Sequence, residues 1–176
     1  LTLDDVSFIS ALTTVSQLQE IVFGKQLHAL VIKNANISSV TVMNALIVMY
    51  SRCDSIQEVF RVFDGMIEKD AVSWNTVITS LVQNMMNEEG LMLVYEMQKH
   101  GVRIDEVTIT AILSAASNLR NHAIGKQTHS YLIRNEIEFE GMNGYLIDMY
   151  SKTGLINQSR VLFQKSVDFS KDQATW

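Results

Sequence analysis

Gly24-Lys25-Gln26-Leu27-His28 occurs a second time in the chain, as Gly125-Lys126-Gln127-Thr128-His129. The second copy begins 101 residues after the first. Residues 46–51, Leu-Ile-Val-Met-Tyr-Ser, likewise return at 146–151 as Leu-Ile-Asp-Met-Tyr-Ser. Self-similarity at a nearly fixed spacing is the signature of repeat architectures, in which similar units stack side by side. These copies therefore predict that the 176 residues form an array of repeats.

Each repeat is predicted to be a pair of amphipathic helices. Apolar residues recur at every third or fourth position from Val72 to Val82, and a second such stripe runs from Leu91 to Met97. Gly101 follows this second stripe, where a left-handed helix stop is expected. Similar pairs occupy residues 6–18 with 23–32 and 43–50 with 56–63, and no segment keeps the alternation of a strand. Helix pairs that bury their faces against neighbouring pairs form an α-solenoid, so the predicted fold class is all-α.

The composition limits the classes of function. Apolar residues make up 47% of the chain, enough for a core, but no apolar run approaches the ~20 residues of a membrane helix. We therefore expect a water-soluble protein without a membrane partner. The single cysteine, Cys53, excludes an internal disulfide and any paired-cysteine zinc site, and no metal or cofactor is expected. The net charge of −5 and the pI near 5.3 argue against a broad phosphate-binding surface.

No pattern of residues indicates catalysis. His28 and His129 are equivalent in two repeats, so we expect them to pack helices together rather than to act as catalytic groups. Cys53 has Thr153 as its counterpart, so we interpret it as a small filler rather than a nucleophile. The Gly-Lys pairs lack the other residues of a phosphate-binding loop, and a deaminase zinc centre needs more cysteines than the chain has. These residues are therefore predicted not to form an enzyme.

Three kinds of segment resemble the pentatricopeptide repeat (PPR) family. Val72-Ser73-Trp74-Asn75-Thr76-Val77-Ile78, followed by Gly101-Val102-Arg103-Ile104-Asp105, resembles the standard repeat. Residues 44–53 with 62–66 resemble the short repeat, and the two Gly-Lys-Gln segments resemble the second helix of the long repeat. The order long, short, standard is that of the plant PLS subclass. The expected repeats are 5–39 (long), 40–70 (short), 71–105 (standard), 106–139 (long) and 140–172 (short), with 1–4 ending an upstream repeat and 173–176 starting the next.

The resemblance implies both a fold and a function. The implied fold is an α-solenoid of stacked helix-turn-helix repeats that forms a right-handed superhelix. The implied function is sequence-specific binding of single-stranded RNA, as the recognition array of a plant organellar factor for C-to-U RNA editing. Such a factor works in the chloroplast or the mitochondrion, with accessory proteins of the editing complex as further partners. Catalysis would come from a deaminase-like domain or a partner outside these residues.

Two asparagine–aspartate pairs are the candidate base-reading residues. The first helix of each repeat is expected to line the concave face of the array. Matching positions in two consecutive repeats are occupied by Asn75 with Asp105 and by Asn44 with Asp70. An asparagine amide has a donor and an acceptor for a base edge, and a nearby carboxylate orients it. The resemblance implies that this pair favours uracil, then cytosine, so the predicted partner is RNA with adjacent pyrimidines. The alternative for both asparagines is a structural cap at a helix N-terminus.

The remaining repeats give less complete sets of site residues. Thr110 is the candidate base-reading residue of the second long repeat, at the position of Asn75. The residue that ends this repeat, at the position of Asp105, is Phe139 or Glu140. The last short repeat has Gly144 at the reading position and closes with Asp172. The resemblance implies that the second residue of three repeats sandwiches successive bases: Thr41, Val72 and Val107.

Two basic residues are candidates for contact with phosphate. Arg52 and Lys152 share one position in the two short repeats, where a phosphate would be met without a basic protein overall. The alternative for each is solvated helix surface. Four acidic residues are expected in second helices, away from the concave face: Glu58, Glu88, Glu89 and Glu96.

A protein-binding α-solenoid of the tetratricopeptide type is the alternative function. The acidic pI and the nine methionines fit that class, whereas the two asparagine–aspartate pairs favour RNA. The two ends of the segment are expected to expose apolar helix faces, because terminal repeats normally cap such stacks. We therefore also expect the segment to self-associate.

Overall fold

The described residues form ten α-helices joined by short turns. The structure is a computed structural model that describes residues 4–33 and 39–173, with side chains to residue 167. The bounds are α1 (Asp5–Leu18), α2 (Ile21–Lys33), α3 (Val40–Arg52), α4 (Ile56–Gly65), α5 (Ala71–Gln83), α6 (Asn87–Lys99), α7 (Glu106–Asn118), α8 (His122–Arg134), α9 (Met142–Lys152) and α10 (Ile156–Gln173). The predicted all-α fold class is confirmed, and none of these helices is long and apolar enough to cross a membrane.

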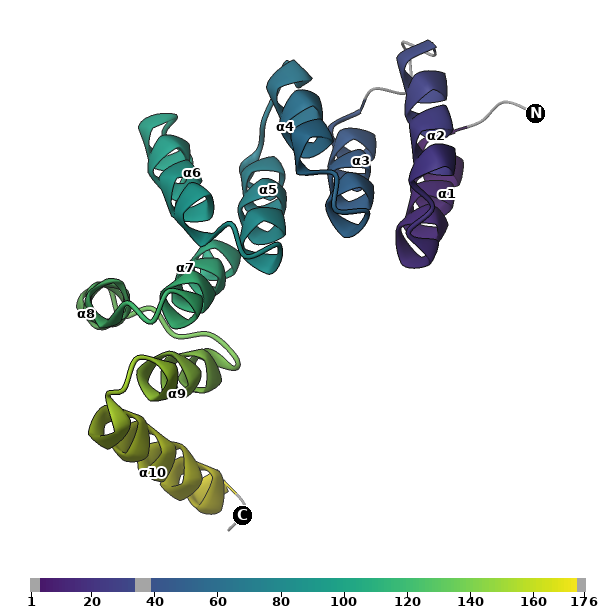
Figure 1. Cartoon of the computed structure of the whole chain (residues 1–176). Coiled ribbons are helices and arrows are strands. Elements are labelled where there is room, and N and C mark those ends of the chain that lie inside the picture. The colour runs from purple at the N-terminus through teal and green to yellow at the C-terminus, as the bar shows by residue number, and fades with distance from the viewer. Residues whose placement is uncertain (1–3, 34–38, 174–176) are drawn as a thin grey trace.

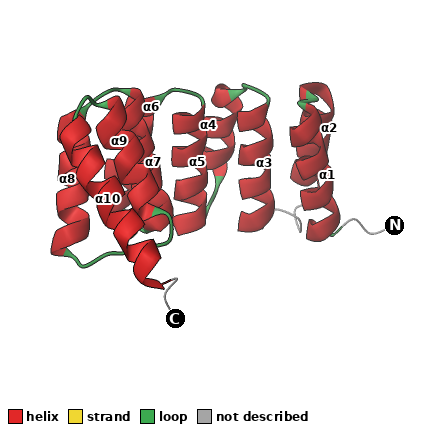
Figure 2. Cartoon of the chain, turned by 90° about the horizontal axis from the view of Figure 1, so that it is seen from below, coloured by secondary structure: helices red, strands yellow, loops and turns green. Residues whose placement is uncertain are grey.

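The helices are arranged as consecutive pairs along an arc. Figure 1 shows α3, α5, α7 and α9 along the inner side of the arc and α4, α6 and α8 along its outer side. Figure 2 gives the view from below, in which the helices stand side by side. Each first helix packs against the next, α1 on α3, α3 on α5, α5 on α7 and α7 on α9. The inner surface is therefore a row of first helices, as expected for a helix-pair solenoid.

One polar residue before each of the first four inner helices caps its N-terminus. The side chains of Asp4, Ser39, Asp70 and Asp105 each accept a hydrogen bond from the backbone N–H of the residue three positions later. Such a cap contributes about 1 kcal/mol to helix stability because it satisfies an otherwise unpaired donor. Just after the C-terminus of α6, Gly101 has a φ of 75°, which confirms the predicted left-handed stop.

The two Gly-Lys-Gln segments lie in α2 and α8, the second helices of their pairs. They pack these helices onto the first helix of the following pair, α3 and α9. Gly24 and Gly125 leave room for the side chains of Met49 and Met149, which a Cβ at either glycine would overlap. One turn further on, His28 Nδ1 lies 2.9 Å from the Tyr50 hydroxyl, and His129 Nδ1 lies 2.8 Å from that of Tyr150. Burial lowers the pKa of both histidines, which keeps the rings neutral. These contacts agree with the packing role predicted for His28 and His129.

Two helical glycines, one buried and one exposed, are expected to respond in opposite directions to alanine. Gly125→Ala forces Met149 to move, and this overpacking outweighs the gain in helix propensity, for a net loss of about 1 kcal/mol. Gly144→Ala meets no heavy atom within 4 Å and stabilises α9 by about 0.5–1 kcal/mol. Urea unfolding of both variants measures the difference. Equal stabilisation by the two substitutions would contradict the proposed packing of Gly125 on Met149.

Candidate functional site

Asn75 is held by two residues of the following helix pair. It is the fifth residue of α5 and its side chain is 6% exposed. Its Nδ2 donates to Oδ1 and Oδ2 of Asp105 at 2.9 and 2.8 Å, and its Oδ1 accepts from the Thr108 hydroxyl at 2.6 Å. The capping role considered for Asn75 belongs instead to Asp70, whose side chain accepts from the backbone N–H of Ser73.

Asp105 is fixed by its own role at the start of α7. Its Oδ1 accepts from the backbone N–H of Thr108 at 2.9 Å, and the Thr108 hydroxyl accepts from the backbone N–H of Asp105 at 3.4 Å. This reciprocal arrangement is a capping box, which satisfies two otherwise unpaired donors. The helix cap therefore positions the same carboxylate that contacts the Asn75 amide.

A pocket of about 370 Å³ opens beside this pair on the inner surface. Asn75 and Asp105 line it together with the exposed Val72 of α5 and Val107 of α7. Arg52, the last residue of α3, lines the same pocket. Residues predicted separately for base reading, base sandwiching and phosphate contact thus share one cavity. The pocket offers a polar amide and a carboxylate beside apolar surface, with a cation nearby.

The equivalent pair in the preceding unit is arranged differently. Asn44 is the fifth residue of α3 and is buried, and Asp70 accepts from the backbone N–H and hydroxyl of Ser73 at 2.8 and 2.9 Å. Among the residues that the structure describes, Asn44 Oδ1 has no hydrogen-bond partner. Asp70 and Asn44 are therefore not joined as Asp105 and Asn75 are. Thr41 is exposed near the start of the same helix.

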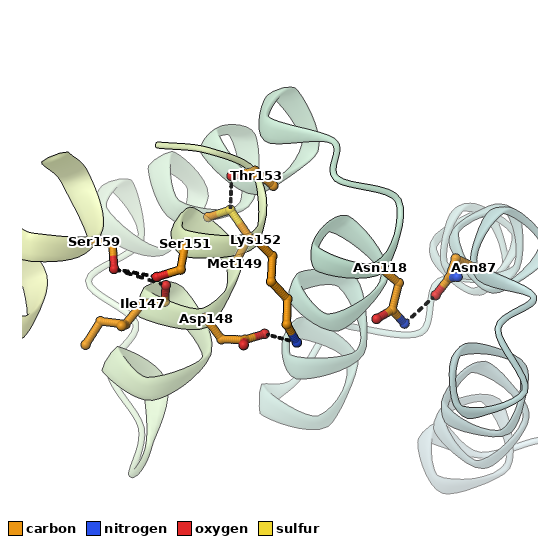
Figure 3. Close-up of polar contacts among 9 residues, drawn as sticks. All are labelled: Asn87, Asn118, Ile147, Asp148, Met149, Ser151, Lys152, Thr153 and Ser159. Carbon is orange, nitrogen blue, oxygen red and sulfur yellow. Dashed lines mark hydrogen bonds and ion pairs between the residues drawn. The ribbon is translucent and has the colours of Figure 1, made fainter. Parts of the chain in front are cut away.

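The remaining predicted residues lie apart from this pocket. Thr110 is half-buried on α7 and donates its hydroxyl to the carbonyl of Val107 at 2.8 Å. Lys152 Nζ forms an exposed ion pair with Asp148 at 2.9 Å, drawn in Figure 3. The negative charge of Asp148 partly offsets the attraction of Lys152 for a phosphate. Asp172 lies within α10, which continues to Gln173, so its backbone is helical rather than in a closing turn. Its side chain is outside the described ones.

The four predicted acidic residues lie on the outer row of helices. Glu58 lies on α4, and the other three predicted acidic residues lie on α6, as expected for second helices. Glu58 pairs with Arg61 at 2.8 Å and Glu96 with Lys99 at 2.9 Å, both on the outer row. The negative net charge therefore includes residues that do not line the pocket of Asn75.

Two kinds of polar contact were not predicted from the sequence. Thr108, buried at the third position of α7, joins Asn75 to Asp105. The sequence does show a hydroxyl residue three positions after each aspartate, Ser73 after Asp70 and Thr108 after Asp105. Polar pairs between neighbouring helix pairs were also missed, such as Asn118 Nδ2 to Asn87 Oδ1 at 2.9 Å (Figure 3). Residues about 31 apart in sequence make these contacts, which helix periodicity alone does not specify.

Comparisons with known proteins identify similar repeats. Residues 69–118 match the PPR repeat family, and residues 41–70 match the PPR repeat. A chloroplastic pentatricopeptide repeat-containing protein of Arabidopsis thaliana is 57% identical over 173 residues, which are 98% of this chain and 21% of that protein. A mitochondrial one from the same plant is 31% identical over 169 residues, which are 96% of this chain and 16% of the relative. The chain thus spans about a fifth of the length of these proteins.

A solved structure shares the fold. The crystal structure of the pentatricopeptide repeat protein PPR10 from maize superposes with a TM-score of 0.72 at 19% sequence identity. The match covers 98% of this chain and 26% of the maize chain. At this level of identity the likeness concerns the arrangement of the helices. It agrees with the α-solenoid predicted from the repeated segments.

Proposed function

From the premise that these residues are part of a pentatricopeptide repeat protein, which the family matches and the relatives support, we propose that the chain binds single-stranded RNA. The observation that carries the proposal is the pocket in which Asn75 and Asp105 lie beside Val72 and Val107. Apolar side chains from neighbouring helices pack on the faces of a base, while the amide meets its edge. Arg52 supplies a positive charge for the adjoining phosphate.

The hydrogen bonds left on Asn75 fit a pyrimidine edge. The two oxygens of the Asp105 carboxylate share one N–H of Nδ2, and Thr108 takes one lone pair of Oδ1, so one N–H and one lone pair of the amide remain. Uracil presents an N–H next to a carbonyl oxygen, which complements a neighbouring acceptor and donor. Cytosine offers its amino group and ring nitrogen in the opposite order, and the amide meets these less well while Asp105 fixes its orientation. This order favours uracil over cytosine, and the proposed preference is the one that the family resemblance implies, uracil first and cytosine second.

The wider role proposed is that of a recognition array. The repeats at 5–39, 40–70, 71–105, 106–139 and 140–172 are proposed to follow the PLS order, as part of an organellar RNA-editing factor. Relatives named chloroplastic or mitochondrial support localisation in a plant organelle. Catalysis is proposed to come from a domain or partner outside these residues.

The test is a change of base preference on substitution of Asn75. Full-length protein that contains this chain is equilibrated with a randomised RNA pool, and the bound sequences are compared between wild type and Asn75→Thr. We expect one RNA position to change from uracil towards guanine, with a discrimination of about 1–3 kcal/mol for one base contact. Asn157→Thr, on the exposed surface of α10, is the matched control and is expected to leave the bound sequences unchanged.

Two outcomes contradict the proposed function. Absence of RNA binding by the wild-type protein would reject it directly. Equal weakening on all four bases by Asn75→Thr would make Asn75 a structural residue and would favour the protein-binding solenoid instead.

A further inference from the structure

We propose that Thr108 is a positioning residue that fixes the orientation of the Asn75 amide and thereby sharpens the choice of base. The inference rests on the proposed function, which it deepens by naming a residue that acts on specificity without contacting RNA. Thr108 is fully buried at the third position of α7, between the Asn75 amide and the Asp105 carboxylate. It therefore acts through Asn75.

The two ends of an asparagine amide have opposite hydrogen-bonding character, and base choice depends on which end faces the ligand. A carboxylate only accepts, so Asp105 holds Nδ2 on its side, with Nδ2 lying 2.8–2.9 Å from both of its oxygens. The Thr108 hydroxyl donates to Oδ1 at 2.6 Å from the other side. A flipped amide would place Oδ1 against the carboxylate, while Nδ2 would donate to the Thr108 hydroxyl, whose single proton would turn to Asp105 Oδ1 at 2.9 Å. Asp105 therefore selects the orientation, and the short hydrogen bond from Thr108 holds the Oδ1 end of the amide in place.

The preceding unit has the same asparagine and aspartate without this second anchor. Ser73 has the position of Thr108, and its hydroxyl lies 2.9 Å from Asp70 Oδ1 as that of Thr108 does from Asp105 Oδ1, but no described hydrogen bond joins it to Asn44. In the part of the chain that the structure describes, Asn44 Oδ1 has no hydrogen-bond partner, although the atom is buried. Identical reading residues are thus held with different rigidity in two consecutive units. We expect stricter base discrimination opposite Asn75 than opposite Asn44.

The experiment measures how well the full-length protein discriminates bases at the RNA position that responds to Asn75→Thr. Equilibrium affinities are measured for RNAs with each of the four bases at that position. Thr108→Val keeps the shape of the side chain and removes the hydroxyl. The ratio of the affinity for the uracil RNA to the affinities for the other three RNAs is expected to fall about 2- to 10-fold, which corresponds to the free energy of one hydrogen bond. Thr108→Ser retains the hydroxyl, and its ratio is expected to lie between those of Thr108→Val and the wild type, because the serine at the equivalent position 73 contacts only its aspartate.

A ratio of affinities separates positioning from simple damage to the fold, because a structural lesion weakens all four RNAs alike. Ser73→Ala removes a hydroxyl from the same position one unit earlier and is expected to leave the ratio opposite Asn75 unchanged. Thr108→Ala is measured beside Thr108→Val, so that a packing defect of one variant does not decide the result. An unchanged ratio in both, in a protein that still switches base with Asn75→Thr, overturns the role of Thr108 alone. Failure of the wild-type protein to bind RNA overturns this inference together with the proposed function.

Discussion

Replacing Trp74 with alanine is expected to lower the free energy of unfolding by about 3–5 kcal/mol, the cost of removing a buried aromatic ring. Trp74 is 5% exposed on α5. Its ring centroid lies 5.0 Å from that of Phe63, in an edge-to-face arrangement, and 5.2 Å from that of His100. The indole thus joins α4, α5 and the C-terminus of α6. Its loss leaves a cavity between two helix pairs, where α5 meets α4 and the C-terminus of α6.

Urea unfolding followed by circular dichroism measures this loss in the 176-residue chain. Trp74→Phe keeps an aromatic ring and is expected to lose less than half as much. Met92→Ala, whose side chain is 70% exposed on α6, is the control and is expected to change stability by less than about 0.5 kcal/mol. A loss for Trp74→Ala no larger than that of the control would show that the ring cluster does not couple the helix pairs.

Replacing Asp105 with alanine is expected to weaken both stability and base discrimination. The helix cap of α7 is lost, at about 1 kcal/mol, and the buried Asn75 amide loses its charged acceptor, at about another 1–2 kcal/mol. Asp70→Ala removes the equivalent cap of α5, where no described contact joins the carboxylate to Asn44. The first variant is therefore expected to lose at least 1 kcal/mol more than the second.

Unfolding curves and RNA affinities of both variants test this difference. Asp105→Asn retains a capping oxygen, because asparagine caps helices about as well as aspartate, so it separates the cap from the charge and second acceptor oxygen that Asp105 offers to Asn75. Discrimination opposite Asn75 is expected to fall in Asp105→Ala and to persist in Asp70→Ala. Equal losses of stability in the two alanine variants would indicate that the contact between Asp105 and Asn75 contributes nothing beyond the cap.

The elements of the fold were predictable because each follows from local pattern. The stripe from Val72 to Val82 lies in α5 (Ala71–Gln83), and Gly101 has the left-handed conformation expected after α6. The repeated histidines also met the expectation of a packing role, since His28 and His129 make equivalent contacts with Tyr50 and Tyr150. Periodicity determines which face of a helix is buried, and repetition extends that result along the array.

The candidate site was predictable only in part, because its contacts depend on side chains from different helix pairs. Matching positions predicted equal roles for Asn75 and Asn44, yet the structure joins only the first of them to its aspartate. The difference coincides with Thr108 in place of Ser73, one of several differences between the two units that comparison of positions does not weigh. Lys152 matched Arg52 in position, but Asp148 one turn earlier pairs with it.

The packing of each inner helix on the next has a mechanical consequence. Neighbouring pairs are joined through their first helices, α1 to α3, α3 to α5, α5 to α7 and α7 to α9. Such a stack stretches like springs in series, in which the compliance of every junction adds to the total. A rotation of a few degrees at each junction, about what close-packed helices tolerate by small side-chain shifts, changes the pitch of the whole arc. Such changes of pitch would let the array match the nucleotide spacing of the proposed RNA ligand while the geometry inside each pair is preserved.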